Sequence, residues 1–307
     1  MTKPSFGSQA FYLLFRLLAI RKKFSLEWLL KTGRKPGNAC PPDKFYKKYA
    51  VTHEEINQRK VWYIRPKENA TGHYLLYLHG GAYVQNFLTL HWALFPKLID
   101  RLGCTIVAPD YPLAPEHQVK SVYDMLIPLY QQLVKKAGAE NLAIMGDSAG
   151  GGISLALAQQ LREEKIPQPA SLVLLSPWLD ISLSTPGTEQ MQHMDPILSV
   201  EGLRECGKLY AGNMEKDHYL LSPVNGTLNK LAPLTLFIGG RDVLLPDCRR
   251  LKKRTEAEGI SMDYHEYPYM LHDWMLLPIP EAREVLDLIT LKLKKDKFEM
   301  TQLRKQE

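Results

Sequence analysis

The chain has 307 residues, 45% of them hydrophobic and 23% charged, a composition that excludes a disordered or membrane-embedded protein and fits a soluble globular one. This length allows one large domain with a small appendage. The formal net charge is +6, but the lysines and arginines are dispersed rather than gathered into a patch interleaved with aromatic residues. We therefore expect no nucleic-acid partner.

The cysteines and histidines predict neither a disulfide framework nor a metal site. The histidines lack the spacing of metal-ligand motifs. The cysteines are widely spaced, without a C-x-x-C pair, which favours reduced thiols in a cytoplasmic protein. They are Cys40, Cys104, Cys206 and Cys248.

The first predicted element is an apolar helix over residues 10–20. It is too short to span a membrane and is interrupted by Arg16. The basic residues 21–23 stand where a signal peptide would have its cleavage site. Because apolar residues continue at helical spacing through 27–30, we interpret the segment as a helix that covers a groove on its own protein. A helix lying on a membrane surface is the alternative.

From about residue 46, strands and helices alternate. Such alternation with short connections predicts an α/β fold, in which helices cover both faces of a mostly parallel sheet. The expected strands are 61–64, 74–78, 104–108, 142–145, 171–175, 234–238 and 262–267. The expected helices are 88–102, 121–136, 149–164, 246–258 and 281–294.

One stretch, residues 182–221, interrupts this alternation. It holds several short helical patterns where a single crossover helix would suffice, so we interpret it as an insertion. Together with residues 1–45 it is expected to form a helical cap. The core would then consist of residues 46–181 and 222–307.

Ser148 lies between Gly146 and Gly150, where a predicted buried strand ends and a helix begins. A nucleophile at so sharp a turn requires small neighbours, because larger side chains would collide with the strand and the helix. The turn would present the hydroxyl at the carboxyl edge of the sheet, where open α/β folds bind ligands. On its own, G-x-S-x-G also fits an ordinary glycine-rich turn.

A catalytic serine requires a base and an acid that orients the base. Asp242 and His272 each follow a late predicted strand, in the chain order serine, acid, histidine that this kind of fold uses. Asp247 is the competing acid, but it falls in the next predicted helix and is expected to face solvent. The plainer interpretation of His272 is a structural histidine.

The sequence Leu78-His-Gly-Gly-Ala-Tyr83 follows another predicted strand. Acyl transfer places negative charge on the former carbonyl oxygen, and fixed backbone N–H groups stabilise that charge. Consecutive glycines let the backbone approach the oxygen closely. We expect the amides of Gly80, Gly81 and Ala149 to form this oxyanion hole, with Ala82 as a further candidate.

The segments His79-Gly-Gly-Ala-Tyr83 and Gly146-Asp-Ser-Ala-Gly-Gly151 together resemble the hormone-sensitive lipase family of α/β-hydrolases. Residues 109–117 resemble the family's Y-R-L-A-P-E-H segment, and similar stretches occur at 175–180 and 222–223. The resemblance implies an α/β-hydrolase fold with a helical cap. It also implies a carboxylesterase without a cofactor that acts on short- to medium-chain acyl esters, with Ser148 as nucleophile, Asp242 as acid and His272 as base.

The sequence departs from the family pattern near each catalytic position. Ala82 replaces a third glycine, and the D-x-L-R-D segment is lengthened by one residue at 242–247. Asp273-Trp274 replaces a common Gly-Phe after the histidine. Asp147 is shared with the family, and we interpret it as a support for the surrounding loops rather than a catalytic acid.

The hypothesis we favour is a serine carboxylesterase acting on a small-molecule ester, with homodimer formation left open. The alternatives are a ligand receptor on the same fold without turnover, and a hydrolase of amides, peptides or lactones. Each residue expected in the substrate pocket could equally serve core packing. These residues are Ala82, Tyr83, Phe87 and Trp178.

Overall fold

The structure is a computed structural model that describes residues 3–34 and 38–303. Its centre is an eight-stranded sheet with the order β1-β2-β4-β3-β5-β6-β7-β8. β2 runs antiparallel to both β1 and β4, whereas the other neighbours are parallel, which confirms the predicted mostly parallel α/β sheet. The strands are β1 Tyr49–Ile56, β2 Arg59–Pro66, β3 Tyr74–Leu78, β4 Thr105–Pro109, β5 Leu142–Asp147, β6 Ser171–Leu175, β7 Leu234–Gly239 and β8 Met262–Tyr267.

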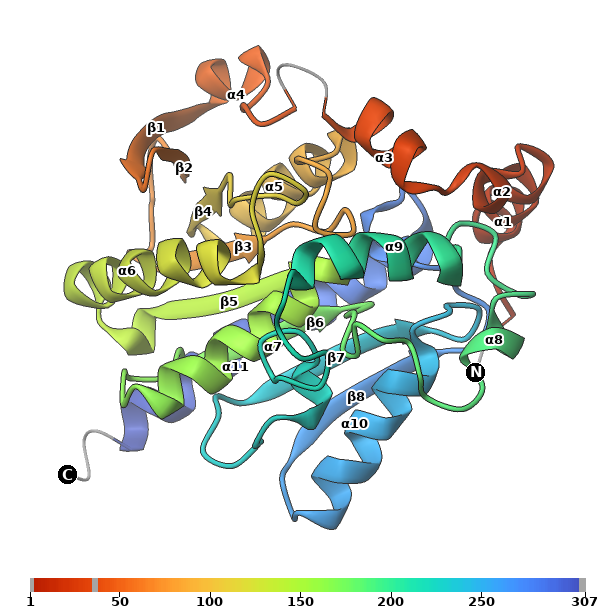
Figure 1. Ribbon diagram of the computed structural model, residues 1–307. Coiled ribbons are helices and arrows are strands. Elements are labelled where there is room, and N and C mark those ends of the chain that lie inside the picture. Colours follow the sequence, from red (N-terminus) through yellow and green to blue (C-terminus); the bar gives the residue numbers. More distant parts are fainter. Residues whose placement is uncertain (1–2, 35–37, 304–307) are drawn as a thin grey trace.

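Helices cover both faces of this sheet (Figure 1). α5 and α11 pack on one face, and α6, α7 and α10 pack on the other. Side chains alternate along each strand, so Leu76 faces one layer of helices and Tyr77 the other. The five helices are α5 Thr89–Leu102, α6 Val119–Ala137, α7 Ser148–Glu163, α10 Leu245–Ala257 and α11 Pro280–Leu303.

The sequence patterns do not predict β1. Its residues 49–56 include exposed polar side chains, and the strand pairs only with β2 at the edge of the sheet. An edge strand that is largely open to solvent lacks the apolar run by which the buried strands are recognised.

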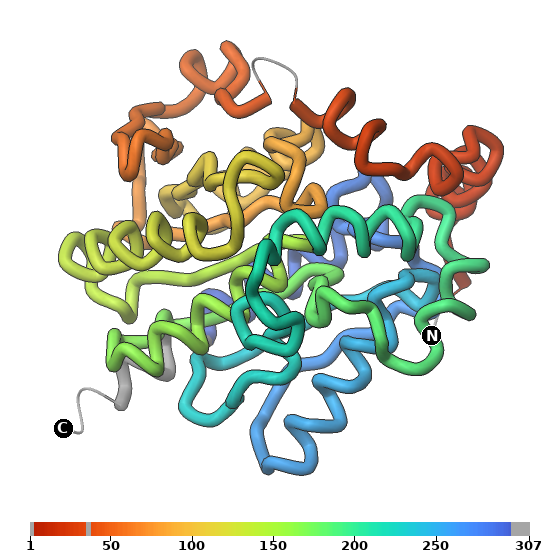
Figure 2. The backbone as a smooth tube through the Cα atoms, viewed as in Figure 1, coloured from red at the N-terminus to blue at the C-terminus, as the bar shows by residue number. Residues whose placement is uncertain are grey.

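The N-terminal segment and the predicted insertion lie against each other (Figures 1 and 2). The amide of Arg21 donates to the carbonyl of Pro196 at 3.2 Å, and Gly202 lies so close to the carbonyl of Phe24 that a Cβ there would be 2.6 Å from it. The short helices are α1 Phe6–Leu17, α2 Ile20–Lys23, α3 Leu26–Gly33, α4 Asp43–Lys48, α8 Thr188–Met191 and α9 Val200–Ala211, with 3-10 turns η1 Ala139–Asn141, η2 Pro223–Asn225 and η3 Trp274–Leu276.

Asp180 fastens the two ends of the insertion to each other. Its carboxylate accepts hydrogen bonds from the hydroxyls of Ser182 at 2.6 Å and Ser184 at 3.0 Å. It also accepts one from Ser222 at 3.3 Å, at the other end of the insertion. The predicted insertion therefore begins and ends at one place in the structure. Three stretches lie outside the described part of the chain. They are residues 1–2 and 35–37 of the predicted N-terminal cap segment and residues 304–307 at the end of the predicted core.

Candidate active site

Ser148 stands at the turn between β5 and α7, with a left-handed φ of 50°. A Cβ on Gly150 would be 2.0 Å from the carbonyl oxygen of Leu78, and one on Gly146 would be 2.4 Å from the carbonyl of Gly150. Both positions therefore exclude any side chain, for the steric reason expected from the sequence. A non-glycine residue with positive φ is strained, and such strain is found where surrounding structure holds a functional group in place.

The structure brings together the three side chains that the sequence predicted to cooperate. With its proton on Nδ1, His272 donates to Asp242 Oδ2 at 2.8 Å. Its Nε2 then accepts from the hydroxyl of Ser148 at 3.0 Å. Asp242 is fully buried, and its Oδ1 accepts from the amide of Leu244 at 2.9 Å. This arrangement fixes the imidazole so that its free lone pair faces the serine.

A second carboxylate reaches the same imidazole nitrogen. Asp273 Oδ2 lies 3.1 Å from Nε2 of His272, and the φ of 51° at Asp273 turns its side chain back toward the site. Burial raises the pKa of Asp273 to about 7. Burial alone would lower the pKa of His272, but the carboxylates of Asp242 and Asp273 outweigh it and raise that pKa well above the ordinary value. His272 is therefore a strong base held between two acids.

Asp147 ties the nucleophile turn to the loop after β3. Its Oδ1 accepts from the Tyr77 hydroxyl at 2.7 Å. Its Oδ2 accepts from the amide of Gly80 and from Nε2 of His91, both at 3.0 Å. Burial would raise the pKa of Asp147, but His91 and the Tyr77 hydrogen bond hold it below its ordinary value. These contacts are those of the loop support expected from the sequence.

The hydrogen bond from the amide of Gly80 to Asp147 limits which backbone amides are free to donate to an oxyanion. The amide of Gly80 already donates to Asp147, so of the glycines expected to donate, Gly81 is the one left to face a substrate. The chain then passes through three left-handed residues, with φ of 114° at Gly81, 54° at Ala82 and 63° at Tyr83. Two of them are not glycine, so this loop is strained beside the nucleophile.

The residues expected in a substrate pocket occupy two different environments. Tyr83 stacks on Tyr210 of α9, with ring centroids 3.9 Å apart, and lies 5.0 Å from the ring of Trp178. The amide of Trp178 donates to the carbonyl of Ser148 at 2.9 Å. Phe87 instead packs among the aromatic side chains of the α5 layer, 4.7 Å from Trp92. The backbone of Trp178 thus adjoins Ser148, but all four side chains expected in the pocket are at most 4% exposed and belong to the core: Ala82, Tyr83, Phe87 and Trp178.

Asp195, in the insertion, is a residue that the sequence did not single out. Its Oδ2 accepts from the amide of Val243 at 3.0 Å, next to Asp242. Its Oδ1 accepts from Ile197 and Leu198 at 2.8 and 2.9 Å, and burial, together with the charge of Asp242, raises its pKa to about 6. The Asp-Pro sequence signals the local turn, but nothing in it signals the contact with Val243.

Asp247 does not face solvent, contrary to the expectation from the sequence. It lies in the first turn of α10, as expected, but is 1% exposed. The helix packs this face inward, toward the segment at Asp180. The acid that is hydrogen-bonded to His272 is Asp242.

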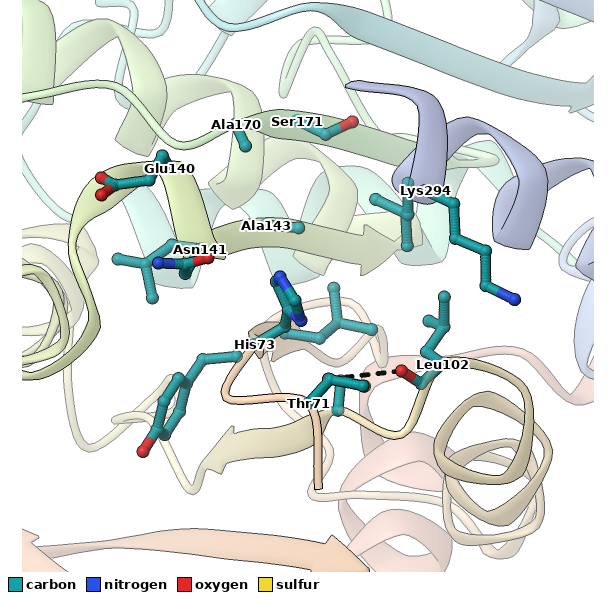
Figure 3. A pocket seen from close by; sticks show the side chains of 14 residues that line it. Thr71, His73, Leu102, Glu140, Asn141, Ala143, Ala170, Ser171 and Lys294 are labelled. Carbon is teal, nitrogen blue, oxygen red and sulfur yellow. Dashed lines mark hydrogen bonds between the residues drawn. The ribbon is translucent and has the colours of Figure 1, made fainter. Parts of the chain in front are cut away.

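A separate cavity of about 260 Å³ lies at the opposite, amino-terminal edge of the sheet (Figure 3). His73 and Ala143 line it at the starts of β3 and β5, and the Thr71 hydroxyl donates to the carbonyl of Leu102 at 3.4 Å. It is smaller than most ligand pockets and lies far along the strands from Ser148. Across the described residues, no three His, Cys, Asp or Glu side chains are grouped so that they could hold a metal ion.

Comparisons with known proteins agree with this architecture. A family model described as alpha/beta hydrolase fold matches residues 75–276. An esterase of Acinetobacter venetianus is 30% identical over 69% of this chain and 71% of its own length. An acetyl-hydrolase of Streptomyces hygroscopicus is 30% identical over 74% and 76%, and an ethyl acetate hydrolase of Pseudomonas putida is 29% identical over 88% and 87%.

Solved structures extend the similarity over nearly the whole fold. A putative esterase from Staphylococcus aureus superposes with a TM-score of 0.78 at 26% identity, covering 94% of this chain and 93% of that one. An esterase from the bacterial hormone-sensitive lipase family gives 0.82 at 28% identity, covering 97% and 100%. The fold and the turn at Ser148 are those of an α/β-hydrolase. The chain belongs to this family and, within it, to the carboxylic ester hydrolases of the hormone-sensitive lipase type.

Proposed function

We propose that the protein is a serine carboxylesterase that hydrolyses short- to medium-chain acyl esters through an acyl-enzyme. The observation that carries the proposal is the pair of hydrogen bonds at His272, 3.0 Å to Ser148 and 2.8 Å to Asp242. An imidazole held in this way can take the serine proton as the hydroxyl attacks. The acetyl-hydrolase and the ethyl acetate hydrolase among its relatives support a small acyl group.

The reaction follows from this geometry. Ser148 Oγ bonds to the ester carbonyl carbon while its proton moves to Nε2 of His272, and the carbonyl oxygen becomes an oxyanion. Collapse of this intermediate breaks the bond to the alcohol oxygen, which takes the proton from Nε2 and leaves. Water then attacks the acyl group, gives its proton to Nε2, and the acid departs as that proton returns to Ser148.

We propose that the amides of Gly81, Ala82 and Ala149 form the oxyanion hole. Ala149 lies in the first turn of α7, and helix starts present unpaired amides and the positive end of the helix dipole. Gly80 supports the hole indirectly, because its hydrogen bond to Asp147 fixes the loop. We also propose that residues 1–45 and 182–221 form the cap over this site.

The test is hydrolysis of p-nitrophenyl esters of increasing chain length by the parent protein and by Ser148→Ala. We expect the highest kcat/KM for short chains and a loss of at least about 10⁴-fold in the variant. An unchanged melting temperature in the variant shows that the loss is chemical. Equal rates for variant and parent would contradict the assignment of Ser148.

Two alternatives remain distinguishable in the same experiment. A ligand receptor would show no turnover of any ester by the parent protein, although it would bind the esters. Anilides and lactones matched to the best acyl group test the other hydrolase classes, because the acyl-enzyme route is common to all of them. The four free thiols support a cytoplasmic location.

A further inference from the structure

Helix α1 carries an apolar ridge that its own protein leaves uncovered. Phe6, Leu13 and Leu17 are spaced so that they lie in one stripe along the helix, and they are 89%, 57% and 83% exposed. Leu14 and Leu18 widen this ridge and are also exposed. In the part of the chain that the structure describes, the exposed large hydrophobic side chains are concentrated on this helix.

The opposite face of α1 packs against the rest of the protein. Phe11 and Phe15 pack against the core layer of α5 and α11, and the ring of Tyr12 lies 3.9 Å from the guanidinium carbon of Arg241. Covering its own protein therefore accounts for only half of this apolar helix. The outer ridge requires a separate explanation.

All the charged residues in the segment that carries the ridge are basic. Between residues 3 and 26 the sequence has five basic residues and no aspartate or glutamate. Of these, Lys3, Arg16, Lys22 and Lys23 are exposed. The carboxylate of Glu281, which accepts from the amide of Ser5 at 2.6 Å, holds the start of the helix to the core. An apolar ridge flanked by exposed cations is the pattern of a helix that lies in the interface of an anionic membrane.

The charge decides between the two plausible partners of the ridge. Two copies of this chain that met ridge to ridge would bring two basic segments together, and their like charges would repel. Anionic lipid headgroups would instead neutralise the lysines and arginines while the acyl region accepts the leucines and Phe6. Lipid thus matches both properties of the surface.

We propose that α1 and the basic residues beside it form a docking surface for anionic lipid. α1 lies at the edge of the molecule next to α2, away from the outer ends of α6 and α10 (Figure 1). Because Tyr12 contacts Arg241, the residue before Asp242, docking would place the membrane against the side of the protein that carries the acid loop. The chain would then meet ester substrates where they partition into lipid.

The test is co-sedimentation of the full chain with vesicles of phosphatidylcholine alone and with one third phosphatidylglycerol. We expect binding to the anionic vesicles that weakens as salt is raised. The variant F6Q/L13Q/L17Q should bind at least about tenfold more weakly, and K22Q/K23Q should lose about tenfold on anionic vesicles only. The matched control is Leu291→Gln on α11, which changes a leucine that is 66% exposed and should leave binding unchanged.

Three results would overturn the proposal. The first is an absence of binding by the parent protein. The second is equal loss of binding in Leu291→Gln. The third is a parent protein that sediments as two copies while F6Q/L13Q/L17Q sediments as one, which would make the ridge a contact between copies. The substituted side chains are exposed, so an unchanged melting temperature, measured alongside, shows that each variant is folded. Since binding needs no turnover, Ser148→Ala should bind vesicles like the parent.

Discussion

Replacing Asp273 by glycine tests whether the second carboxylate at His272 controls when the catalytic base is free. Asp273 Oδ2 lies 3.1 Å from the same Nε2 atom that must take the serine proton. An ionised Asp273 stabilises the imidazolium, which cannot act as a base. Glycine suits the left-handed backbone at this position and removes the carboxylate without adding a new group.

The size of the effect follows from the geometry. Two unit charges about 4 Å apart interact by about 4 kcal/mol at an effective dielectric constant of about 20. Burial opposes ionisation of Asp273 and raises its pKa to about 7. The cost of desolvating the carboxylate therefore offsets much of its attraction to the imidazolium. We therefore expect a net effect of about 1–2 kcal/mol on protonation of the base, or about 5- to 30-fold in activity near pH 7, where Asp273 ionises.

The direction is fixed by the charge. Carboxylates raise the pKa of His272, so removing one lowers that pKa and leaves the base unprotonated at more acidic pH. The acid limb of kcat/KM for a short p-nitrophenyl ester should move to lower pH in Asp273→Gly. Asp273→Asn, which keeps the size of the side chain, should move it in the same direction. Superimposable pH profiles for parent and both variants would refute the reasoning.

Three further substitutions have outcomes fixed by contacts in the structure. Gly150→Ala, whose Cβ would be 2.0 Å from a backbone oxygen, should lower kcat by about 10²-fold or more, whereas Gly7→Ala, with ordinary 3.5 Å contacts, should leave it unchanged. Asp195→Ala leaves the buried amide of Val243 unpaired and should cost about 1–3 kcal/mol in urea unfolding. Asp247 has its pKa raised from 3.8 to about 7, so its cost to stability is absent below pH 4 and complete above pH 7. Asp247→Asn should therefore stabilise the protein by up to about 4 kcal/mol at pH 8.5 and not at pH 4.

The fold could be predicted where burial leaves a periodic pattern. Every strand from β2 to β7 has an apolar run, because helices cover both faces of the inner sheet. β1 is not predicted from the sequence, because its edge position leaves Thr52 and His53 exposed and so interrupts the apolar pattern. The proximity of Ser148, Asp242 and His272 could be predicted as well, since parallel strands bring their carboxyl ends to one edge and each of these residues follows such an end.

The polar contacts around the triad could not be predicted in the same way. The hydrogen bond from Gly80 to Asp147 depends on how two loops meet, and the contact from Asp195 to Val243 depends on how the insertion folds onto the core. Neither pair has a fixed spacing in the sequence. The burial of Asp247 and the outward face of α1 likewise follow from how helices rotate about their axes, which an imperfect apolar periodicity leaves open.

The carboxylates around His272 also bear on which molecules the site favours. Asp147 and Asp242 are buried beside the nucleophile, and Asp195 and Asp273 add two acids whose pKa values burial raises to about 6 and about 7. An ester is neutral, so this negative environment does not oppose its entry. The carboxylic acid released by deacylation ionises as it leaves, and like charge then disfavours its return. The arrangement thus favours binding of the ester over binding of the acid product. We expect the free acid to inhibit more weakly than a neutral ester of the same chain length.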